Sequence, residues 1–256
     1  MERFADRCVL ITGAGSGIGR ATVHRILAEG GTVVGADISD AGLAETVKQA
    51  AERGTADRLT TLRIDIADEA SVRAGVAKAV ESLGGLDALV NAAGILRSAH
   101  THEMPLADWN RIITTNLTGT FLMIRESLPA LLESGRGVIV NFASTSTFFA
   151  HPYMSAYAAS KGGIMSMTHA LASEYAKQGL RAVAVAPGSI SSDMTDGRGP
   201  GIPDDADMSL FMKLMPALGQ GFASPDTVAG VVAMLASDDG AFITGTEVRI
   251  DGGTHM

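Results

Sequence analysis

Several residue types are scarce in this sequence, and each scarcity excludes a class of protein. Cys8 is the only cysteine among 256 residues, so no disulfide can form within the chain and a reducing compartment is expected. Lysine and arginine together number 20 against 28 acidic residues, which leaves a net charge of −8 and no basic stripe for a nucleic-acid backbone. Nucleic-acid binding is therefore not expected.

Long hydrophobic runs are also missing. The longest apolar stretches, such as Val183 to Ala186, are far too short for a membrane helix, and Arg7 interrupts any signal-like stretch at the N-terminus. No membrane association is expected, and the predicted location is the cytoplasm. Hydrophobic residues make up 46% of the chain and charged ones 19%, which excludes a disordered chain. Since no linker interrupts the sequence, we expect a single domain spanning residues 1–256.

Short β-branched runs alternate with longer stretches of helical periodicity along the chain. Several of the runs are apolar at consecutive positions, as expected of parallel strands that helices cover on both faces. The predicted fold class is therefore α/β, a doubly wound parallel sheet of about seven strands with helices on both faces. The predicted strands are Cys8 to Thr12, Thr32 to Ala36, Leu59 to Ile64, Ala88 to Val90, Val138 to Val140, Arg181 to Ala186 and Glu247 to Ile250.

The segment from Ser191 to Gly221 departs from this alternation. It begins with closely spaced glycines and prolines and continues with an apolar cluster, which predicts a loop followed by a helix. Two interpretations are open: a surface excursion that packs its own apolar side, or a lid over a bound substrate. The apolar cluster consists of Met208, Leu210, Phe211, Met212, Leu214 and Met215.

A glycine-rich turn joins the first predicted strand to a helical stretch. The turn contains Gly13, Ser16, Gly17, Ile18 and Gly19. Glycines permit a tight turn and a close approach of the backbone, so that free N–H groups and the positive end of a helix can face a pyrophosphate. The spacing is Gly-x-x-x-Gly-x-Gly, and no Gly-Lys-Ser/Thr of a triphosphatase loop follows. The turn indicates dinucleotide binding, with a ligand-free strand–helix connection as the alternative.

Asp37 follows the second predicted strand, 20 residues beyond Gly17. An acid at this place can accept hydrogen bonds from the adenosine ribose hydroxyls and would repel a 2′-phosphate. Neither Ala14 to Ile18 nor Ile38 to Ala41 contains a lysine or arginine. We therefore predict NAD rather than NADP as the cofactor; the alternative is a turn or capping aspartate.

A Tyr-x-x-x-Lys motif, Tyr157 to Lys161, accompanies this turn, and together they resemble the short-chain dehydrogenase/reductase family. The resemblance implies a Rossmann-type subunit, a nicotinamide cofactor and a catalytic tetrad of Asn116, Ser144, Tyr157 and Lys161. It runs nearly from end to end and includes Asp65, Asn91-Ala92-Ala93-Gly94, Pro187-Gly188 and Asp251-Gly252-Gly253. The cofactor contacts that it adds to the turn and Asp37 are Asp65, Ile66, Asn91, Ala92, Gly94, Tyr157, Lys161, Pro187, Gly188, Ile190 and Ser192.

Three positions depart from the family pattern. Ala92 replaces a second Asn, Thr145 replaces a Ser after Ser144, and Ser192 replaces a Thr after the Pro-Gly turn. None of these changes removes a catalytic side chain. Ser192 keeps a hydroxyl for the nicotinamide carboxamide, while Ala92 leaves Asn91 as the structural amide.

The tetrad predicts acid–base chemistry at a hydroxyl or carbonyl group. A free tyrosine has a pKa of about 10, too high for an efficient base near neutrality. Tyr157 and Lys161 are four residues apart and share one helix face, so the ammonium is expected to lower the phenol pKa. Ser144 follows an apolar strand and is expected to polarise the reacting oxygen. By the resemblance, Lys161 also holds the nicotinamide ribose and Asn116 holds a water; ordinary packing is the alternative for Asn116.

The residues expected around the substrate are mostly apolar, which predicts a hydrophobic or cyclic secondary alcohol or ketone. No Gly-x-Ser-x-Gly surrounds a serine, so a serine hydrolase is not expected. His100 and His102 beside Glu103 lack a second ligand group, so no metal site is predicted. The predicted pocket residues are Leu96, Ser144, Phe149, His151, Met154, Met208, Phe211 and Met212.

The leading hypothesis is an NAD-dependent oxidoreductase that transfers a hydride between nicotinamide and a secondary alcohol or ketone. Alternatives are an NADPH-dependent carbonyl reductase, a dinucleotide-binding sensor without turnover, and a nucleotide-sugar epimerase or dehydratase, for which the chain lacks room. The stretch Lys161 to Glu174 carries no charge between its ends and is apolar around most of its circumference. With the resemblance, this implies a homotetramer built partly on this helix and on the Trp109 to Leu132 helix.

Overall fold

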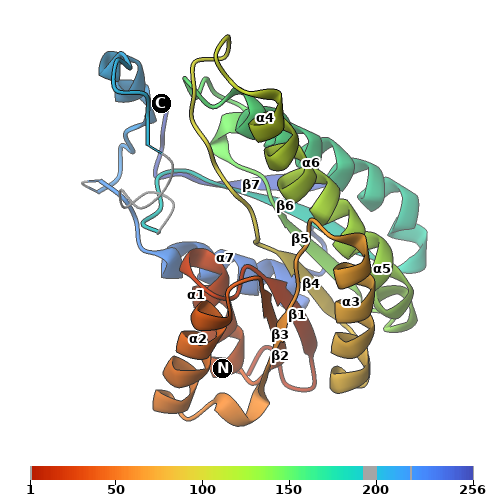
Figure 1. The fold of residues 1–256 in the computed structure, drawn as a ribbon. Coiled ribbons are helices and arrows are strands. Elements are labelled where there is room, and N and C mark those ends of the chain that lie inside the picture. The colour runs from red at the N-terminus through yellow and green to blue at the C-terminus, as the bar shows by residue number, and fades with distance from the viewer. Residues whose placement is uncertain (1, 193–200, 220, 256) are drawn as a thin grey trace.

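Seven strands form one parallel sheet in the computed structural model, which describes residues 2–192, 201–219 and 221–255 (Figure 1). The strands are β1 (Cys8–Thr12), β2 (Thr32–Asp37), β3 (Leu59–Arg63), β4 (Ala88–Asn91), β5 (Val138–Phe142), β6 (Arg181–Pro187) and β7 (Thr246–Ile250). Their order across the sheet is β3-β2-β1-β4-β5-β6-β7. This arrangement confirms the predicted doubly wound α/β fold.

Two layers of helices cover the sheet. The longer helices are α1 (Gly17–Ala28), α2 (Asp40–Glu52), α3 (Glu69–Leu83), α4 (Leu106–Ile113), α5 (Gly119–Glu133), α6 (Ser155–Tyr175) and α7 (Pro225–Ala236). Helices α1, α2 and α7 lie on one face, while α3, α5 and α6 lie on the other, with α4 beside α6 (Figure 1). Short helical turns span Ala56–Arg58, Thr114–Thr118, Thr145–Thr147, Ala176–Gln178, Met208–Leu214 and Asp238–Gly240. No helix within the described ranges has both the length and the apolar character needed to cross a membrane.

The strands are apolar at consecutive positions because both faces of the sheet are covered. Val9 and Ile11 pack into the core beneath α1 and α7, whereas Leu10 between them packs beneath α3 and α5. All three side chains are fully buried. Successive side chains of a strand point to opposite faces, so a strand between two helical layers needs an apolar residue at every position.

The strand order reverses between β1 and β4, and this reversal positions the site. At its carboxyl end, β1 pairs with β2 through Thr12 and Ala36, and with β4 through Thr12 and Asn91. The connections leave β1 and β4 toward opposite sides, so a crevice opens beyond the carboxyl ends of these strands. The glycine turn follows β1 and Ser144 follows β5, so both lie at this edge.

The predicted lid is only partly regular. Met208–Leu214 forms a 3₁₀ helix at the place where the sequence predicts a helix after the loop. The end of the segment is tied to the C-terminal residues, where the Leu218 N–H donates to the Gly252 carbonyl at 2.8 Å. Figure 1 draws it beside the C-terminus. Residues 193–200 and 220 of the predicted lid lie outside the described residues.

Candidate active site

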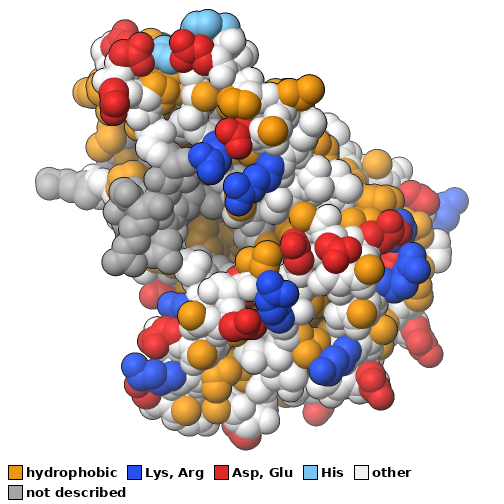
Figure 2. Space-filling model, viewed as in Figure 1, with side chains coloured by type: hydrophobic (Ala, Val, Ile, Leu, Met, Phe, Trp, Pro, Cys, Tyr) orange, Lys and Arg blue, Asp and Glu red, His pale blue; other side chains and the backbone are white. Residues whose placement is uncertain are grey.

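A cavity of about 940 Å³ opens at the carboxyl ends of β1, β4, β5 and β6. Its walls come from the glycine turn, the end of β2, the start of α6 and the segment 201–219. Figure 2 shows the hollow on the viewed face, with hydrophobic side chains at its base. A space of this volume lies at the upper end of the range for small-molecule sites.

The glycine turn is fitted so closely to its surroundings that two of its positions exclude any side chain. Gly13 has φ of 70°, and a Cβ added there would lie 2.9 Å from the backbone of Ala92 and Ala93. A Cβ added at Gly19 would lie 2.0 Å from the Gly13 carbonyl oxygen. Helix α1 begins at Gly17, and the Ser16 side chain makes no capping hydrogen bond, so the first N–H groups of α1 remain available to an anion. This turn fits the pyrophosphate of a dinucleotide.

Asp37 lies at the end of β2 and lines the same cavity. Its carboxylate accepts hydrogen bonds from the backbone N–H groups of Gly15 and Ser39, both at 2.9 Å. The guanidinium of Arg20, one residue beyond the glycine turn, donates to the Gly15 carbonyl and to Thr46 Oγ1. Arg20 is thus held by the protein itself, and Asp37 is the charged side chain that faces the ligand space at this point.

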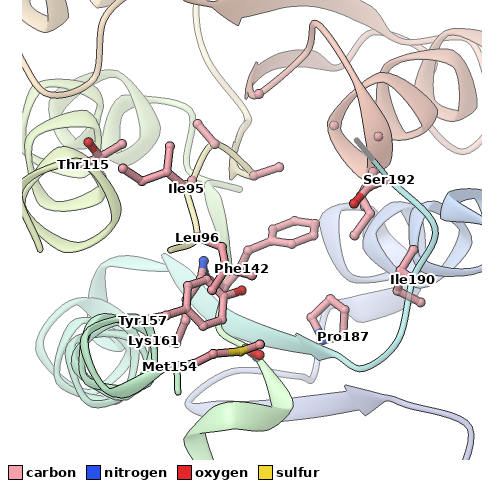
Figure 3. Close-up of a pocket in the computed structure, with 18 of the residues that line it drawn as sticks. Ile95, Leu96, Thr115, Phe142, Met154, Tyr157, Lys161, Pro187, Ile190 and Ser192 are labelled. Atoms are coloured by element: carbon pink, nitrogen blue, oxygen red, sulfur yellow. Dashed lines mark hydrogen bonds between the residues drawn. The ribbon is translucent and has the colours of Figure 1, made fainter. Parts of the chain in front are cut away.

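Tyr157 and Lys161 project from α6 into the cavity, opposite Pro187, Ile190 and Ser192 (Figure 3). Their spacing of one helical turn brings both onto the same face of α6. The Lys161 ammonium donates to the Phe142 carbonyl at 2.7 Å and lies 5.6 Å from the centre of the Tyr157 ring.

Ser144, just after β5, is hydrogen-bonded to Tyr157, and its Oγ also accepts from the Ser146 N–H at 3.1 Å. The phenol, the serine hydroxyl and the ammonium therefore converge on one part of the cavity.

The electrostatics of this group differ from the sequence-based expectation. Burial raises the pKa of the Tyr157 phenol, and the hydrogen bond from Ser144 lowers it in part. Burial also lowers the pKa of Lys161 to about 8. The expected lowering of the Tyr157 pKa by Lys161 is not found, because the ammonium lies over the ring and is bound to the Phe142 carbonyl. In this structure desolvation outweighs the charge pairing.

Asn116 lies within a π-helical turn between α4 and α5 and is fully buried. Its Oδ1 accepts from the Ile95 N–H at 2.8 Å, and its Nδ2 donates to the Ile95 carbonyl at 2.9 Å and to Ser160 Oγ at 3.1 Å. The amide therefore fastens the strand-end loop at Ile95 to α6 beside the Tyr157–Lys161 pair. These are packing contacts, and the water-holding role implied by the resemblance stays a prediction.

Most of the predicted ligand-contacting residues line this one cavity. The predicted cofactor residues found there are Gly13, Ser16, Gly17, Ile18, Gly19, Asp37, Asp65, Ile66, Ala92, Gly94, Tyr157, Lys161, Pro187, Gly188, Ile190 and Ser192. The predicted substrate residues found there are Leu96, Ser144, His151, Met154, Met208 and Phe211.

Three predicted ligand contacts do not line the cavity. Asn91 is buried between strands, and its amide donates to Asn141 Oδ1 at 2.9 Å. Phe149 turns toward the C-terminus and stacks on His255 with ring centres 4.4 Å apart. Met212 is 70% exposed on the outer side of the 3₁₀ helix. Each of these directions depends on tertiary contacts that a local pattern does not contain.

Sequence reasoning also missed residues that line the cavity. Ile38 and Thr115 adjoin predicted positions, so extending each motif by one residue would have found them. Ser98 and Arg111 come from segments without a motif, while Thr254 directly follows the Asp251-Gly252-Gly253 motif, and only the fold brings these residues to the cavity.

The histidines near the cavity mouth contact acids. His100 Nε2 lies 2.9 Å from Asp205 Oδ1, and His102 Nε2 lies 3.6 Å from Glu103 Oε1. Among the residues that the structure describes, no group of three or more His, Cys, Asp or Glu side chains is arranged to hold a metal ion.

The geometry places proton-transfer groups beside a cradle for a dinucleotide, a combination found in nicotinamide-dependent oxidoreductases. Comparison with known sequences specifies the family. The family described as short chain dehydrogenase matches residues 7–202, and the chain belongs to this family. It is therefore an oxidoreductase that binds a nicotinamide dinucleotide.

Similar proteins match over nearly the whole chain. A 3-oxoacyl-(acyl-carrier-protein) reductase of Thermotoga maritima is 37% identical, with 98% of each chain covered. A cis-4-hydroxycyclohexanecarboxylate dehydrogenase of Sinomonas cyclohexanicum is 36% identical, also with 98% of each covered. The crystal structure of carveol dehydrogenase from Mycobacterium avium in complex with NAD superposes with a TM-score of 0.88 at 28% identity, covering 99% of both chains.

Proposed function

We propose that this protein is an NAD-dependent dehydrogenase or reductase that interconverts a secondary alcohol and a ketone. The observation that carries the proposal is that Tyr157, Ser144 and Lys161 face the same cavity as the glycine turn and Asp37. Proton transfer and dinucleotide binding thus share one space. The bound nicotinamide would supply or take up the hydride.

The chain's own residues would handle the proton and the reacting oxygen. Tyr157 gives a proton to the carbonyl oxygen during reduction and takes it from the alcohol during oxidation. Ser144 donates a hydrogen bond to the same oxygen and fixes its position. Lys161, held by the Phe142 carbonyl, lines the same cavity and would hold the nicotinamide ribose, as the family resemblance implies. Because burial raises the Tyr157 pKa, the phenol is protonated at neutral pH and holds the proton that reduction requires.

Asp37 supports NAD as the preferred cofactor. Its carboxylate lines the cavity and would meet the adenosine ribose hydroxyls, where a 2′-phosphate would be repelled. The guanidinium of Arg20 is committed to the Gly15 carbonyl and Thr46, so it does not offset that repulsion.

The walls of the substrate end support a hydrophobic or cyclic substrate. Leu96, Met154, Met208 and Phe211 line the cavity and provide an adaptable apolar surface. Similar proteins named for a cyclohexane derivative and for carveol add support from the comparisons. We propose the segment 201–219 as the lid of this site, because Met208 and Phe211 belong to it.

A homotetramer is proposed as the assembled form. In the single chain, the outer side of α6 is exposed at Ser166, His169 and Ala170, and Phe121 on α5 is 45% exposed. Small and apolar side chains on two neighbouring helices suit a symmetric interface. Solution scattering should give the mass of four chains, and the mass of one chain would contradict this assembly.

Replacement of the phenol tests the proposed chemistry. Tyr157→Phe should retain NADH binding, measured by fluorescence titration, but lose turnover by several orders of magnitude, because the proton donor is gone. Near-normal turnover would remove this mechanism. Tight NADH binding without turnover of any ketone by the unmodified protein would instead favour a dinucleotide-binding sensor.

A further inference from the structure

His151 lies between β5 and α6 and lines the substrate end of the cavity together with Ser144 and Tyr157. Its side chain is not part of the proposed proton transfer. The ring nitrogen Nε2 lies 3.2 Å from Thr145 Oγ1, so one of the two ring nitrogens is bound to the protein. Within the described part of the chain, Nδ1 has no hydrogen-bond partner and is not fully buried, on a side chain that lines the cavity.

The surroundings of Thr145 decide which ring nitrogen of His151 carries the hydrogen. Thr145 is 1% exposed, and its hydroxyl donates to the Pro187 carbonyl at 3.4 Å. A hydroxyl has one hydrogen, so when Thr145 donates it to Pro187, its Oγ1 accepts in the contact with His151. The donor in that contact is then the Nε2–H of the imidazole. A neutral imidazole protonated at Nε2 presents a lone pair at Nδ1.

The ring is also held in its neutral form. Burial, with a smaller contribution from charge repulsion by the nearby His255, lowers the pKa of His151 to about 4. At neutral pH the side chain therefore offers a hydrogen-bond acceptor at Nδ1 rather than a positive charge.

Two other hydroxyl groups that line the cavity donate their hydrogens within the protein. Ser189 Oγ donates to the Leu214 carbonyl at 3.3 Å, and Thr254 Oγ1 donates to the Asp251 carbonyl at 2.8 Å. A ketone without a second polar group would leave the acceptor at His151 Nδ1 without a hydrogen bond. The unpaired acceptor would weaken the binding of that ketone.

We propose that His151 determines substrate specificity by accepting, at Nδ1, a hydrogen bond from a second hydroxyl group of the substrate. His151 lines the cavity together with Ser144 and Tyr157, so we place the second hydroxyl on a carbon close to the reacting one. The preferred substrates are therefore hydroxyketones and the matching diols with an apolar body. The second hydroxyl is bound and not transformed. This inference rests on the proposed function and narrows its substrate class.

The test compares three ketones that differ only in the neighbouring group: 2-hydroxycyclohexanone, its methyl ether 2-methoxycyclohexanone, and cyclohexanone. With NADH, kcat/KM should be roughly tenfold or more higher for the hydroxyketone than for the ether, which cannot donate. His151→Leu should abolish this preference. The ratio is measured within each variant, so a general loss of activity cancels.

Two substitutions at Thr145 separate the orienting role from packing. Thr145→Val has a similar shape but no hydroxyl, so the ring is no longer fixed in one tautomer and the preference for the hydroxyketone should shrink. Thr145→Ser keeps the hydroxyl and should keep the preference. His102→Leu, a change at a side chain that is 79% exposed, is the histidine control and should leave the ratio unchanged.

The tautomer can be measured without any substrate. Nitrogen-15 NMR of the histidine-labelled protein should show His151 protonated at Nε2 and unprotonated at Nδ1 throughout pH 6 to 8. The opposite tautomer would overturn the inference. So would equal efficiency with the hydroxyketone and the ether, or a preference that survives in His151→Leu, although turnover of all three ketones would leave the proposed function intact. Turnover of none of them, despite NADH binding, would contradict the proposed function itself.

Discussion

The Oδ2 atom of Asp37 accepts a hydrogen bond from the Gly15 N–H at 2.9 Å, which links the end of β2 to the glycine turn. A Cβ added at Gly15 would lie 2.8 Å from the Asp37 Cγ, so the acid occupies space that a side chain in the turn would otherwise fill. The carboxylate is therefore fixed at one place on the cavity wall. Its charge acts there on whatever the turn binds.

Removal of that charge should change the choice of cofactor. Asp37→Asn can still accept from Gly15, so the turn should persist while the repulsion of a 2′-phosphate disappears. The ratio of kcat/KM with NADP to that with NAD should rise roughly tenfold or more. Asp40→Asn, at an exposed side chain in the first turn of α2, is the matched control. Similar efficiency with both cofactors in the unmodified enzyme would contradict the assignment of Asp37.

Replacement of Lys161 should stabilise the protein while it abolishes turnover. Burial lowers the pKa of Lys161 from 10.5 to about 8, so the folded state binds this proton more weakly than the unfolded state does. Lys161→Met removes this cost, and the lost hydrogen bond to Phe142 offsets part of the gain. We expect the free energy of unfolding without cofactor to rise by about 1–3 kcal/mol at pH 7.

The pH dependence of this effect has a definite sign. The cost of the buried ammonium is full below pH 8 and disappears as the pH rises toward 10.5, so the advantage of Lys161→Met should shrink across that range. Urea unfolding at several pH values measures it. Lys177→Met, at an exposed position after α6, should show no such trend. The prediction would be refuted if the difference in the free energy of unfolding between Lys161→Met and the unmodified protein stayed constant from pH 7 to pH 10.

His100 connects the loop after β4 to the segment 201–219. The hydrogen bond with Asp205 raises the pKa of His100, with smaller support from Glu103, and the His102 and Tyr153 rings pack beside it. The charged pair is complete below pH 6.5 and is lost as the pH rises through the raised pKa. The KM for the ketone should therefore be lower at pH 6 than at pH 8.5, by a factor of roughly two to five.

Asp205→Asn provides the reference for this prediction. The variant should have the higher KM at pH 6 and should approach the unmodified enzyme at pH 8.5, while the KM for NADH changes little. At each pH the KM of the variant is divided by the KM of the unmodified enzyme, because this ratio removes the titration of Tyr157 from the comparison. An identical pH dependence in both proteins would show that the His100–Asp205 contact does not hold the segment over the substrate.

The fold could be predicted because its signal is local. A strand buried on both faces is apolar at every position, as Val9, Leu10 and Ile11 illustrate, and each of the seven predicted strands is present. The shared position of Tyr157 and Lys161 on one helix face could also be predicted, since residues four apart on a helix lie on the same face.

The directions in which loop side chains point could not be predicted from the sequence. Phe149 turns away from the cavity because His255, more than 100 residues later, offers a stacking partner. Thr254 enters the cavity by the same long-range packing of the C-terminal residues. The pKa values of Tyr157 and Lys161 also escaped prediction, because burial sets them and burial is a property of the whole fold.

The pairing of β1 with β4 constrains how the chain can fold. Val9 pairs with Ala88, so the contact joins parts of the chain that are separated by β2, β3 and their helices. The turn at Gly13 lies against the backbone of Ala92 and Ala93, just beyond β4. We therefore expect the turn to reach its final geometry when β1 and β4 pair. Contacts of this range carry a large loop-closure entropy and slow folding. Affinity for the dinucleotide should consequently appear late in refolding, after most helical signal has returned.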